Sequence, residues 1–328
     1  MAEKVKSRIR EAQVTAKPVK VSVGMPVYNG EKYVGAALEC LLSQTLTDFE
    51  LIISDNASTD RTESICRSYA ARDSRVRYFR NEQNTGGTAN FNRVLELASS
   101  EYFKWACHDD LHAPTYLQQC VEVLDRDRSM VLCHSKTRHI DSNGARLNLK
   151  DHAGGAITDS AGQTLHLARD DPPTMLDSPR AHQRFSDMLS KPYACVNTFG
   201  LVRTAALRAT GGFRPYFGSE RLFLSELALR GRFYHFPEYL FSWRSHAEQV
   251  TRQNAMSRQR QMAPKTNGLI KSKFLPGYCQ MLWKVPLPLN ERMRCHFVLF
   301  SHYARLLLKR LGWARRKEDS KQAAEDLL

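Results

Sequence analysis

Short apolar segments alternate with longer helical patterns between residues 19 and 140, and this alternation restricts the fold more than any other feature. The strand-like runs lie at residues 20–25, 50–54, 75–79, 101–107 and 130–134. The helical patterns between them lie at about 31–44, 60–71, 88–98 and 114–126. Strands separated by helices of this length are typical of βαβ units. The sequence therefore predicts an α/β fold with a mostly parallel, Rossmann-like sheet flanked by helices.

Carboxylates follow two of these strand-like runs. Asp55 comes directly after the run at 51–54, and the adjacent pair Asp109 and Asp110 comes after the run at 101–107. Open α/β sheets bind ligands at the carboxyl ends of their strands. Two neighbouring hard oxygen donors there are suited to a divalent cation that carries a diphosphate. The pattern therefore points to a nucleotide-linked substrate at this edge of the sheet.

The chain changes character after residue 140. Residues 141–180 are rich in Gly, Asp, Pro and Ser, which predicts a long mobile loop of the kind that often covers a substrate. Structured patterns resume at 181. They comprise a strand at 195–203, a helix at about 220–230, a strand at 233–244 and helices from near 268.

The net charge of +14 lies in the two ends of the chain. Residues 1–20 carry six Lys/Arg against two Asp/Glu, residues 258–328 carry fifteen against five, and residues 21–257 carry 27 of each sign. Basic ends on a neutral centre are able to contact nucleic acid, anionic lipid or another polyanion, or to be merely solvated. Apolar residues interleave the C-terminal charges, which favours a membrane surface over a nucleic-acid groove.

Helical spacing places one apolar stripe in the C-terminal segment, bordered by Arg292, Arg305, Lys309 and Arg310. The stripe consists of Met293, Phe297, Phe300, Ala304, Leu307 and Leu311. Such a helix either lies in a lipid headgroup layer or packs its stripe on the core, and both interpretations have equal support. Its longest charge-free stretch, 295–304, is shorter than the roughly 20 residues that span a bilayer. The N-terminus has no apolar signal region, so we expect a cytoplasmic protein, either free or peripheral at the inner face of the membrane.

Four blocks in the chain together resemble the motifs of family-2 glycosyltransferases with the GT-A fold. They run from Val21 to Asn29, Phe49 to Asp60, Asn84 to Asn92 and His108 to Asp110. Each block alone is weak, but four in order at family-like spacing are specific. The resemblance covers roughly 19–250 and implies a nucleotide-diphosphate-sugar donor with Mn²⁺ or Mg²⁺.

The resemblance also implies a division of the chain. Residues 1–18 would form a disordered basic arm, 19–257 the glycosyltransferase domain, and 258–328 a basic helical extension. The expected parts of the domain are a nucleotide-binding half at 19–140, the mobile loop at 141–180 and an acceptor half at 181–257.

Positions that match the family's motifs are implied to bind the nucleotide and donor sugar. They are Pro26, Val27, Tyr28, Asn29, Asp55, Arg80, Gly86, Asn92 and Asp109. Tyr28 would stack on the base or pack on the following helix. Asp55 would accept a hydrogen bond from a base imide or cap the next turn. Arg80 would contact phosphate or be solvated, and Gly86 would allow close backbone approach or only form a turn.

Asp110 corresponds to the family's metal-binding carboxylate. A cation there would hold the diphosphate and stabilise charge on the leaving group. Asp109 would contact the ribose or sugar, and His108 stands where the fuller acidic motif has a further carboxylate. His246 resembles a late histidine of the family that lies near the metal, although an ordinary surface histidine gives the same pattern.

Glu220 is the candidate catalytic base. Gly211-Gly212-Phe213 resembles the loop before the family's catalytic carboxylate, and Glu220 stands at the matching place, where the family usually has aspartate. The dipole at the start of a helix favours an ionised carboxylate, which would take the proton of an attacking hydroxyl. A structural carboxylate gives the same pattern, and Glu226 is the second candidate.

The combined prediction is an inverting glycosyltransferase with a UDP-linked sugar donor and a cell-envelope glycan or lipid-linked acceptor. The inversion comes from the resemblance alone. One alternative is a nucleotidyltransferase, which would need a Gly-rich, Lys/Arg-containing phosphate loop that residues 25–30 lack. The other is a non-enzymatic protein that binds membrane or nucleic acid through its basic ends.

Overall fold

The computed structural model describes residues 19–147, 157–158, 164–165, 174–190, 192–216, 218–249, 257, 261–262 and 274–325, without the side chains of 157–158, 164–165, 192–195, 310 and 312–325. The predicted arm at 1–18 and most of the predicted loop at 141–180 lie outside the described residues. The proposed division into domain and extension stays a prediction.

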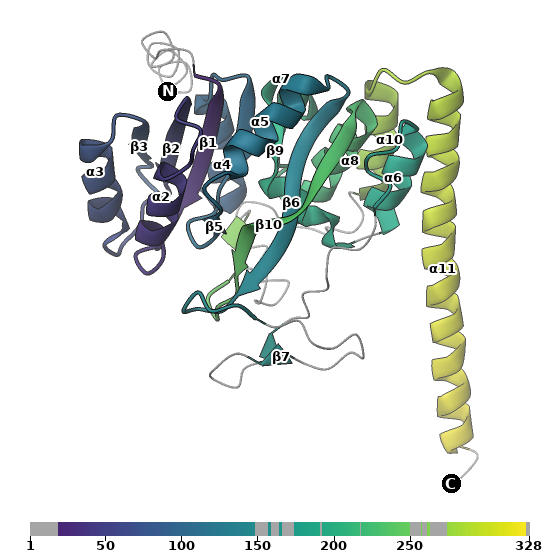
Figure 1. Cartoon of the computed structure of the whole chain (residues 1–328). Coiled ribbons are helices and arrows are strands. Elements are labelled where there is room, and N and C mark those ends of the chain that lie inside the picture. Colours follow the sequence, from purple (N-terminus) through teal and green to yellow (C-terminus); the bar gives the residue numbers. More distant parts are fainter. Residues whose placement is uncertain are drawn as a thin grey trace.

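One eight-stranded sheet forms the centre of the molecule (Figure 1). Its strand order is β3-β2-β1-β4-β9-β6-β10-β5. The pairs β3–β2, β2–β1, β1–β4 and β6–β10 are parallel, whereas β9 is antiparallel to β4 and β6, and β5 is antiparallel to β10. The strands are β1 (Val21–Val27), β2 (Phe49–Asp55), β3 (Val76–Arg80), β4 (Tyr102–Trp105), β5 (Leu111–His112), β6 (Met130–Ile140), β9 (Leu201–Arg203) and β10 (Arg232–Arg244), with a separate hairpin of β7 (Ile157–Thr158) and β8 (Thr164–Leu165).

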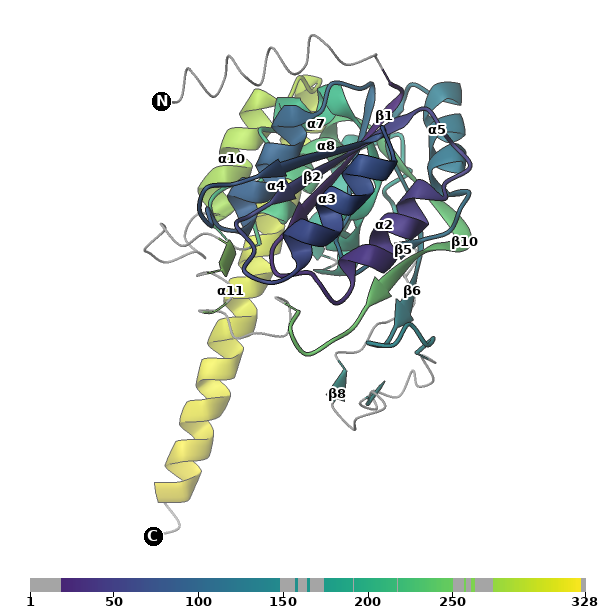
Figure 2. The ribbon, with the colours of Figure 1, turned by 90° about the vertical axis from the view of Figure 1, so that its left-hand side faces the viewer.

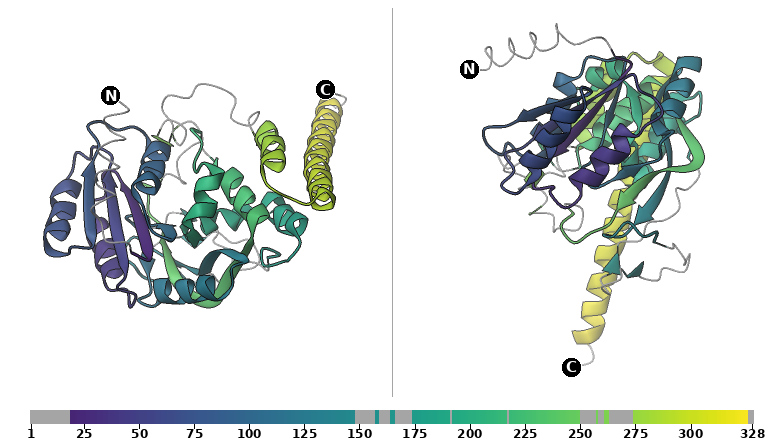
Figure 3. Two further views of the ribbon diagram at one scale, coloured as in Figure 1. Left: turned by 90° about the horizontal axis from the view of Figure 1, so that it is seen from above. Right: turned by 60° about the vertical axis from the view of Figure 1, so that its left-hand side comes forward.

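Helices cover both faces of this curved sheet (Figure 3). They are α2 (Val34–Leu42), α3 (Thr62–Arg72), α4 (Gly87–Leu97), α5 (Tyr116–Arg126), α6 (Ala181–Ser190), α7 (Thr204–Thr210), α8 (Glu220–Arg230), α10 (Phe274–Lys284), α11 (Leu289–Glu325) and the 3₁₀ helix η1 (Pro192–Phe199). Alternate residues of a strand enter different cores. In β4, Tyr102 joins the cluster with α2 and α5, whereas Phe103 and Trp105 join the cluster with α4, α7 and α8. The predicted α/β fold is thus confirmed.

A third apolar cluster joins α6, α8 and α10 to the beginning of α11. A hydrogen bond of 3.0 Å between His182 Nδ1 and Glu291 Oε2 adds a polar contact between α6 and α11. Beyond this contact α11 continues along one side of the molecule, and its C-terminal end projects clear of the rest of the ribbon (Figures 1 and 2). No helix among the described residues has the length and apolar character required to cross a membrane.

The predicted strand at 195–203 is wrong over most of its length. The structure has η1 up to Phe199 and a short strand, β9, from Leu201. Asn197 shows the reason, because its carbonyl accepts the Gly200 amide in a turn and its side chain bonds to His235 Nε2 at 2.6 Å. Polar contacts of this tight turn therefore override the apolar pattern. The helix expected at 220–230 and the strand expected at 233–244 are confirmed within one residue.

Substitution of Gly231 by alanine is expected to destabilise the fold. A Cβ there would clash with Val131 Cγ1 and lie 2.8 Å from the Ser129 carbonyl oxygen, where α8 turns into β10. We expect a loss of about 1–3 kcal/mol, measured by chemical denaturation. Gly35→Ala is the matched control, because nothing lies within 4 Å of its added Cβ and the position is helical. That variant should gain up to about 1 kcal/mol, and equal effects of both changes would contradict the steric argument.

Candidate active site

The predicted site residues gather at the carboxyl ends of the parallel strands β1, β2 and β4. Asn29 follows β1, Asp55 ends β2, and Asp109 and Asp110 follow β4. In open α/β sheets this edge is where ligands bind, because the loops diverge there. His246 follows β10 and comes to the same edge, since its ring contacts Asp109 and Tyr33.

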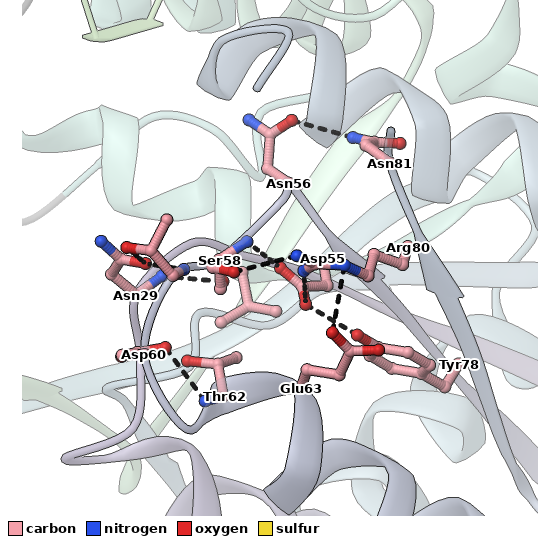
Figure 4. Close-up of polar contacts among 12 residues, drawn as sticks. Asn29, Asp55, Asn56, Ser58, Asp60, Thr62, Glu63, Tyr78, Arg80 and Asn81 are labelled. Atoms are coloured by element: carbon pink, nitrogen blue, oxygen red, sulfur yellow. Dashed lines mark hydrogen bonds and ion pairs between the residues drawn. The ribbon is translucent and has the colours of Figure 1, made fainter. Parts of the chain in front are cut away.

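Asp55 is fully buried and has three hydrogen-bond donors around its carboxylate (Figure 4). The Ser58 amide lies 2.8 Å from Oδ1, while the Tyr78 hydroxyl and the Arg80 guanidinium lie 2.7 and 2.9 Å from Oδ2. The bond to Ser58 closes the turn after β2, as one of the two sequence interpretations expects. Burial, together with the Asp55 hydrogen bond, raises the pKa of Tyr78 far above its usual value. Oδ1 has room for a second donor, but the Asp55 side chain is fully buried, and the contact with a base imide stays a prediction.

The guanidinium of Arg80 is bound to protein groups. Its Nη1 contacts Asp55, its Nε lies 3.1 Å from Glu63 Oε2, and its Nη2 donates to the Ser58 carbonyl at 3.0 Å (Figure 4). Two carboxylates thus fix the guanidinium. The phosphate contact of Arg80 stays a prediction; the side chain is a surface arginine, 32% exposed, whose guanidinium is also paired with Asp55 and Glu63.

The first motif block, Val21 to Asn29, consists of β1 and the two residues that follow it at the edge of the site. Pro26 and Val27 are buried within β1, and Tyr28 is exposed by 37%. Asn29 has a positive φ of 49°, and its side chain accepts the Thr59 amide at 2.8 Å. Of these four predicted residues, Tyr28 and Asn29 are exposed and Pro26 and Val27 are not.

Asparagine side chains connect the loops behind this edge. Asn56 Oδ1 accepts from Asn81 Nδ2 at 2.8 Å and from the Thr85 amide at 3.0 Å, and Asn56 Nδ2 donates to Asn84 Oδ1 at 2.9 Å. Asn90 Nδ2 donates to the Ser54 carbonyl at 2.7 Å. A primary amide both donates and accepts, so it can satisfy loop backbone and side chains together. The sequence analysis assigned no role to Asn56 or Asn81, although both directly follow strands.

Gly86 precedes α4 with a φ of 88°, in the region that favours glycine. The first amides of α4 are therefore directed away from the helix at its N-terminus, an arrangement suited to an anion. Asn92, within α4, bonds to the loop before α8, and its predicted contact with the donor stays a prediction. Its Oδ1 accepts the Phe213 amide at 2.9 Å and its Nδ2 donates to the Phe213 carbonyl at 2.8 Å. Both polar groups of Asn92 thus hold the loop that precedes α8.

Asp109 and Asp110 are held by residues from the far end of the chain. Asp109 Oδ2 lies 2.9 Å from His246 Nε2, and Asp110 Oδ1 accepts the Arg244 amide at 3.0 Å. Burial and the neighbouring Asp109 charge raise the pKa of Asp110 well above its usual value. Burial also opposes ionisation of Asp109, but His108 and His246 lower the pKa of that carboxyl. Two adjacent buried carboxylates therefore repel each other in the protein alone.

Arg244 is a positioning residue that the sequence analysis missed. Its Nε donates to the Asp109 carbonyl at 2.8 Å and its Nη1 to the Asp141 carbonyl at 3.2 Å. Its guanidinium also lies 4.9 Å from the centre of the Tyr33 ring. Arg244 thereby joins the loop after β4 to the end of β10. The only sequence signal for this role is its position two residues before His246.

The chemistry of the donors fits a divalent cation. The side chains of Cys107, Asp109 and Asp110 offer ligand atoms within 4.8 Å of one another. Burial raises the pKa of the Cys107 thiol well above its usual value, so this neutral group is a poor ligand for Mg²⁺ or Mn²⁺. The two carboxylates are the fitting pair, and a cation would relieve their repulsion. His246 Nε2 faces Asp109, while His246 Nδ1 has no hydrogen bond among the described residues and lies 3.9 Å from Glu248 Oε2.

Glu220 is the first residue of α8 and is partly buried. Burial raises the pKa of its carboxyl, whereas a backbone hydrogen bond and Arg221 act in the opposite direction. Its helix is connected to α4 through the Asn92–Phe213 bonds described above. Glu226, the second candidate, is buried and pairs with Arg230 at 2.6 Å and Lys284 at 3.4 Å. These ion pairs give Glu226 a structural role, so Glu220 is the better candidate for a base.

Sequence comparison places this site in a known family. The family model for glycosyl transferase family 2 matches residues 22–205, more than half of the chain. The chain belongs to glycosyl transferase family 2. It is therefore a glycosyltransferase, and the resemblance seen in its four motif blocks is confirmed.

Curated relatives of this glycosyltransferase each match about two fifths of its length. An uncharacterized glycosyltransferase from Rickettsia typhi is 33% identical over 39% of this chain and 39% of its own length. The putative glycosyltransferase EpsE of Bacillus subtilis is 35% identical over 39% of this chain and 46% of its own length. Chondroitin synthase of Escherichia coli is 32% identical over 42% of this chain and 20% of its own length. The chain thus spans less than half the length of these relatives.

Solved structures confirm the fold. Residues 1–349 of S. aureus TarS in complex with UDP-GlcNAc superpose with a TM-score of 0.57 at 19% identity, covering 87% of this chain and 73% of that one. The mannosyltransferase PcManGT from Pyrobaculum calidifontis, in complex with GDP-Man and Mn²⁺, gives 0.50 at 15% identity, covering 94% and 86%. Both support the GT-A fold of this glycosyltransferase.

Proposed function

We propose that this glycosyltransferase moves a sugar from a UDP-linked donor to a hydroxyl group with inversion at the anomeric carbon. The observation that supports this best is the buried pair Asp109 and Asp110, held by His246 and Arg244 at the carboxyl end of β4. TarS holds UDP-GlcNAc, and PcManGT holds GDP-Man with Mn²⁺.

The donor would lie across the edge formed by β1, β2 and β4. Tyr28, whose ring is open to a ligand, would stack on the base, and the backbone of Pro26 to Asn29 would line the nucleotide. Asp55 would contact the base, and Arg80 would contact the phosphate. The amides of α4 after Gly86 would bind phosphate oxygen.

Asp110 and Asp109 would hold Mn²⁺ or Mg²⁺, with His246 Nδ1 as a further contact to the cation or the diphosphate. The cation would supply positive charge for the departing nucleotide diphosphate. Arg244 keeps the loop that carries both carboxylates in place. Because these groups are preorganised by the folded protein, binding requires little rearrangement of their side chains.

Glu220 would act as the general base. The acceptor hydroxyl oxygen attacks the anomeric carbon, its proton passes to the Glu220 carboxylate, and the nucleotide diphosphate leaves with the electrons of the broken C–O bond. A pKa raised by burial brings the carboxyl closer to the operating pH, which suits proton transfer. The two hydrogen bonds of Asn92 to Phe213 would position the loop leading to this base.

We further propose a cell-envelope glycan or a lipid-linked sugar as the acceptor, with the enzyme at the cytoplasmic face of the membrane. The relationship to chondroitin synthase supports a glycan acceptor. Calorimetric titration of the full chain with UDP, GDP and their sugars, with and without Mn²⁺, tests the proposal. Metal-dependent binding of UDP or a UDP-sugar is expected, and no binding of any nucleotide would overturn it.

A further inference from the structure

Helix α11 has two apolar faces, and one of them packs on the protein. Cys295 and Leu299 are fully buried and belong to the cluster that contains Phe185 of α6 and Tyr278 of α10. Their spacing of four residues places them on one side of the helix. This side is the contact of α11 with the rest of the structure.

A second apolar stripe lies on the opposite side of α11. Phe297 is two residues after Cys295, which at about 100° per residue places it across the helix axis. The residues of this stripe are largely exposed: Met293 by 64%, Phe297 by 74%, Phe300 by 58%, Leu307 by 58% and Leu311 by 52%. The core-packing interpretation of this stripe is therefore wrong for the structure as described. Large exposed apolar surfaces of this kind mark interaction sites.

The exposed apolar surface continues to the first residue of α11, Leu289, and to Trp283 near the end of α10. Trp283 is exposed by 68% and Leu289 by 72%. The Trp283 ring lies 5.8 Å from the His296 ring and 5.5 Å from the Arg292 guanidinium. Tryptophan is favoured at boundaries where an apolar body and a polar end are both satisfied. A tryptophan at the end of a long apolar stripe thus suits a lipid headgroup boundary.

The charges of α11 distinguish between possible partners. Residues 289–316 contain seven Lys/Arg and a single acidic residue, Glu291, which is bonded to His182. Among the exposed charges, Arg294 and Arg305 flank the stripe. Over its whole length α11 carries nine Lys/Arg against four acidic residues, so a second copy would bring together two helices with an excess of positive charge, which disfavours self-association. An anionic surface is complementary to both the stripe and its cations.

We propose that the exposed stripe of α11, with Trp283 at its beginning, docks on a membrane surface of anionic lipid. The helix lies parallel to the membrane, its stripe enters the headgroup boundary, and Arg294 and Arg305 contact lipid phosphates. The buried side of α11 around Cys295 packs on α6 and α10, and this contact holds the rest of the glycosyltransferase next to the lipid surface. This inference depends on α11 and is independent of the chemistry at Asp110 and Glu220.

Vesicle co-sedimentation of the full chain tests the proposal. Wild-type protein should bind vesicles of equal parts phosphatidylglycerol and phosphatidylcholine, bind pure phosphatidylcholine more weakly, and lose binding as salt is raised. The triple variant Met293→Gln/Phe297→Gln/Leu307→Gln should lower the partition coefficient by at least about tenfold, because each change removes buried apolar area. Equal binding by wild type and triple variant would overturn the proposal.

Leu306→Gln is the matched control for Leu307→Gln. Leu306 is exposed by 43%. It is seven residues after Leu299 and eleven after Cys295, so it lies on the same side of α11 as these buried residues and not on the exposed stripe. Its effect on partitioning should stay within about twofold, as for an isolated surface substitution. A loss as large as that of the triple variant would show that overall apolarity, rather than this face, controls binding, and would also overturn the proposal.

Light scattering and nucleotide titration separate the remaining outcomes. If wild type is a dimer that the triple variant converts to a monomer, and neither binds vesicles, the stripe is a contact between copies and the proposal fails. Salt-sensitive binding of duplex DNA with no binding of vesicles would likewise overturn it. Because UDP binding is measured on the same variants, failure of membrane docking is distinguishable from failure of the proposed function.

Discussion

Asp110→Ala is expected to eliminate Mn²⁺-dependent binding of nucleotide and to reduce kcat/KM by about 10³-fold. Charge stabilisation by a bound cation contributes several kcal/mol, and each 1.4 kcal/mol corresponds to about tenfold in rate. Among the described residues, one hydrogen bond holds the Asp110 side chain, from the Arg244 amide at 3.0 Å, and the Asp110 carboxyl lies next to the charge of Asp109. Removing it therefore relieves repulsion in the metal-free protein.

Two measurements separate loss of the cation from loss of the fold. Calorimetry with UDP and Mn²⁺ reports binding, and thermal unfolding without metal should show a midpoint for Asp110→Ala no lower than that of wild type. Asp48→Ala is the control, because Asp48 is exposed in the turn before β2 and away from the carboxyl edge of the sheet. Retention of metal-dependent UDP binding by Asp110→Ala would contradict the assignment of the cation site.

Glu220→Gln is expected to lower kcat by about 10² to 10⁴-fold while leaving the affinity for the UDP-sugar unchanged. The amide keeps the size of the side chain but has no carboxylate to take the acceptor proton. Steady-state kinetics with calorimetric measurement of donor affinity checks both parts. Glu238→Gln, an exposed glutamate of β10, is the matched control and should retain wild-type kcat. Loss of donor affinity in Glu220→Gln instead of kcat would contradict the role of base.

The dependence of kcat on pH provides a second test of Glu220. A base is active when deprotonated, so kcat should fall as the pH decreases through the pKa of Glu220. Burial raises this pKa above the usual value of about 4.3, and the acid limb should therefore lie at higher pH than for an exposed glutamate. The residual activity of Glu220→Gln should lack this limb. An identical acid limb in the variant would assign it to another group.

Local sequence patterns predicted the fold and the main candidate residues. The strands ending at Val27, Asp55 and Trp105 are correct because apolar periodicity and strand length are properties of neighbouring residues. In parallel strands the carboxyl ends meet at one edge, so Asp55 and the Asp109–Asp110 pair were expected at the same place. The predicted strand at 195–203 is wrong over most of its length, because the Asn197–Gly200 turn and the contact of Asn197 with His235 depend on tertiary packing.

The partners of the site residues were not predictable in the same way. Asn92 was expected to bind the donor, but its amide meets the Phe213 backbone, which is distant in the sequence. Arg80 was expected to be solvated or bound to phosphate, yet Asp55 and Glu63 hold it in place. Hydrogen-bond partners are chosen by which loops the fold brings together, and a single sequence does not record that proximity.

The sequence by itself thus determined the α/β architecture, the edge at which the carboxylates gather and the family of the enzyme. Each follows from local periodicity or from contiguous motifs. The tertiary structure decided that Arg244 and His246 support the Asp109–Asp110 pair. It also decided which face of α11 is buried, since both faces are apolar and only the positions of α6 and α10 select the one around Cys295. Helical spacing identifies the two apolar faces of α11, whereas contact with a neighbouring element determines which face is buried.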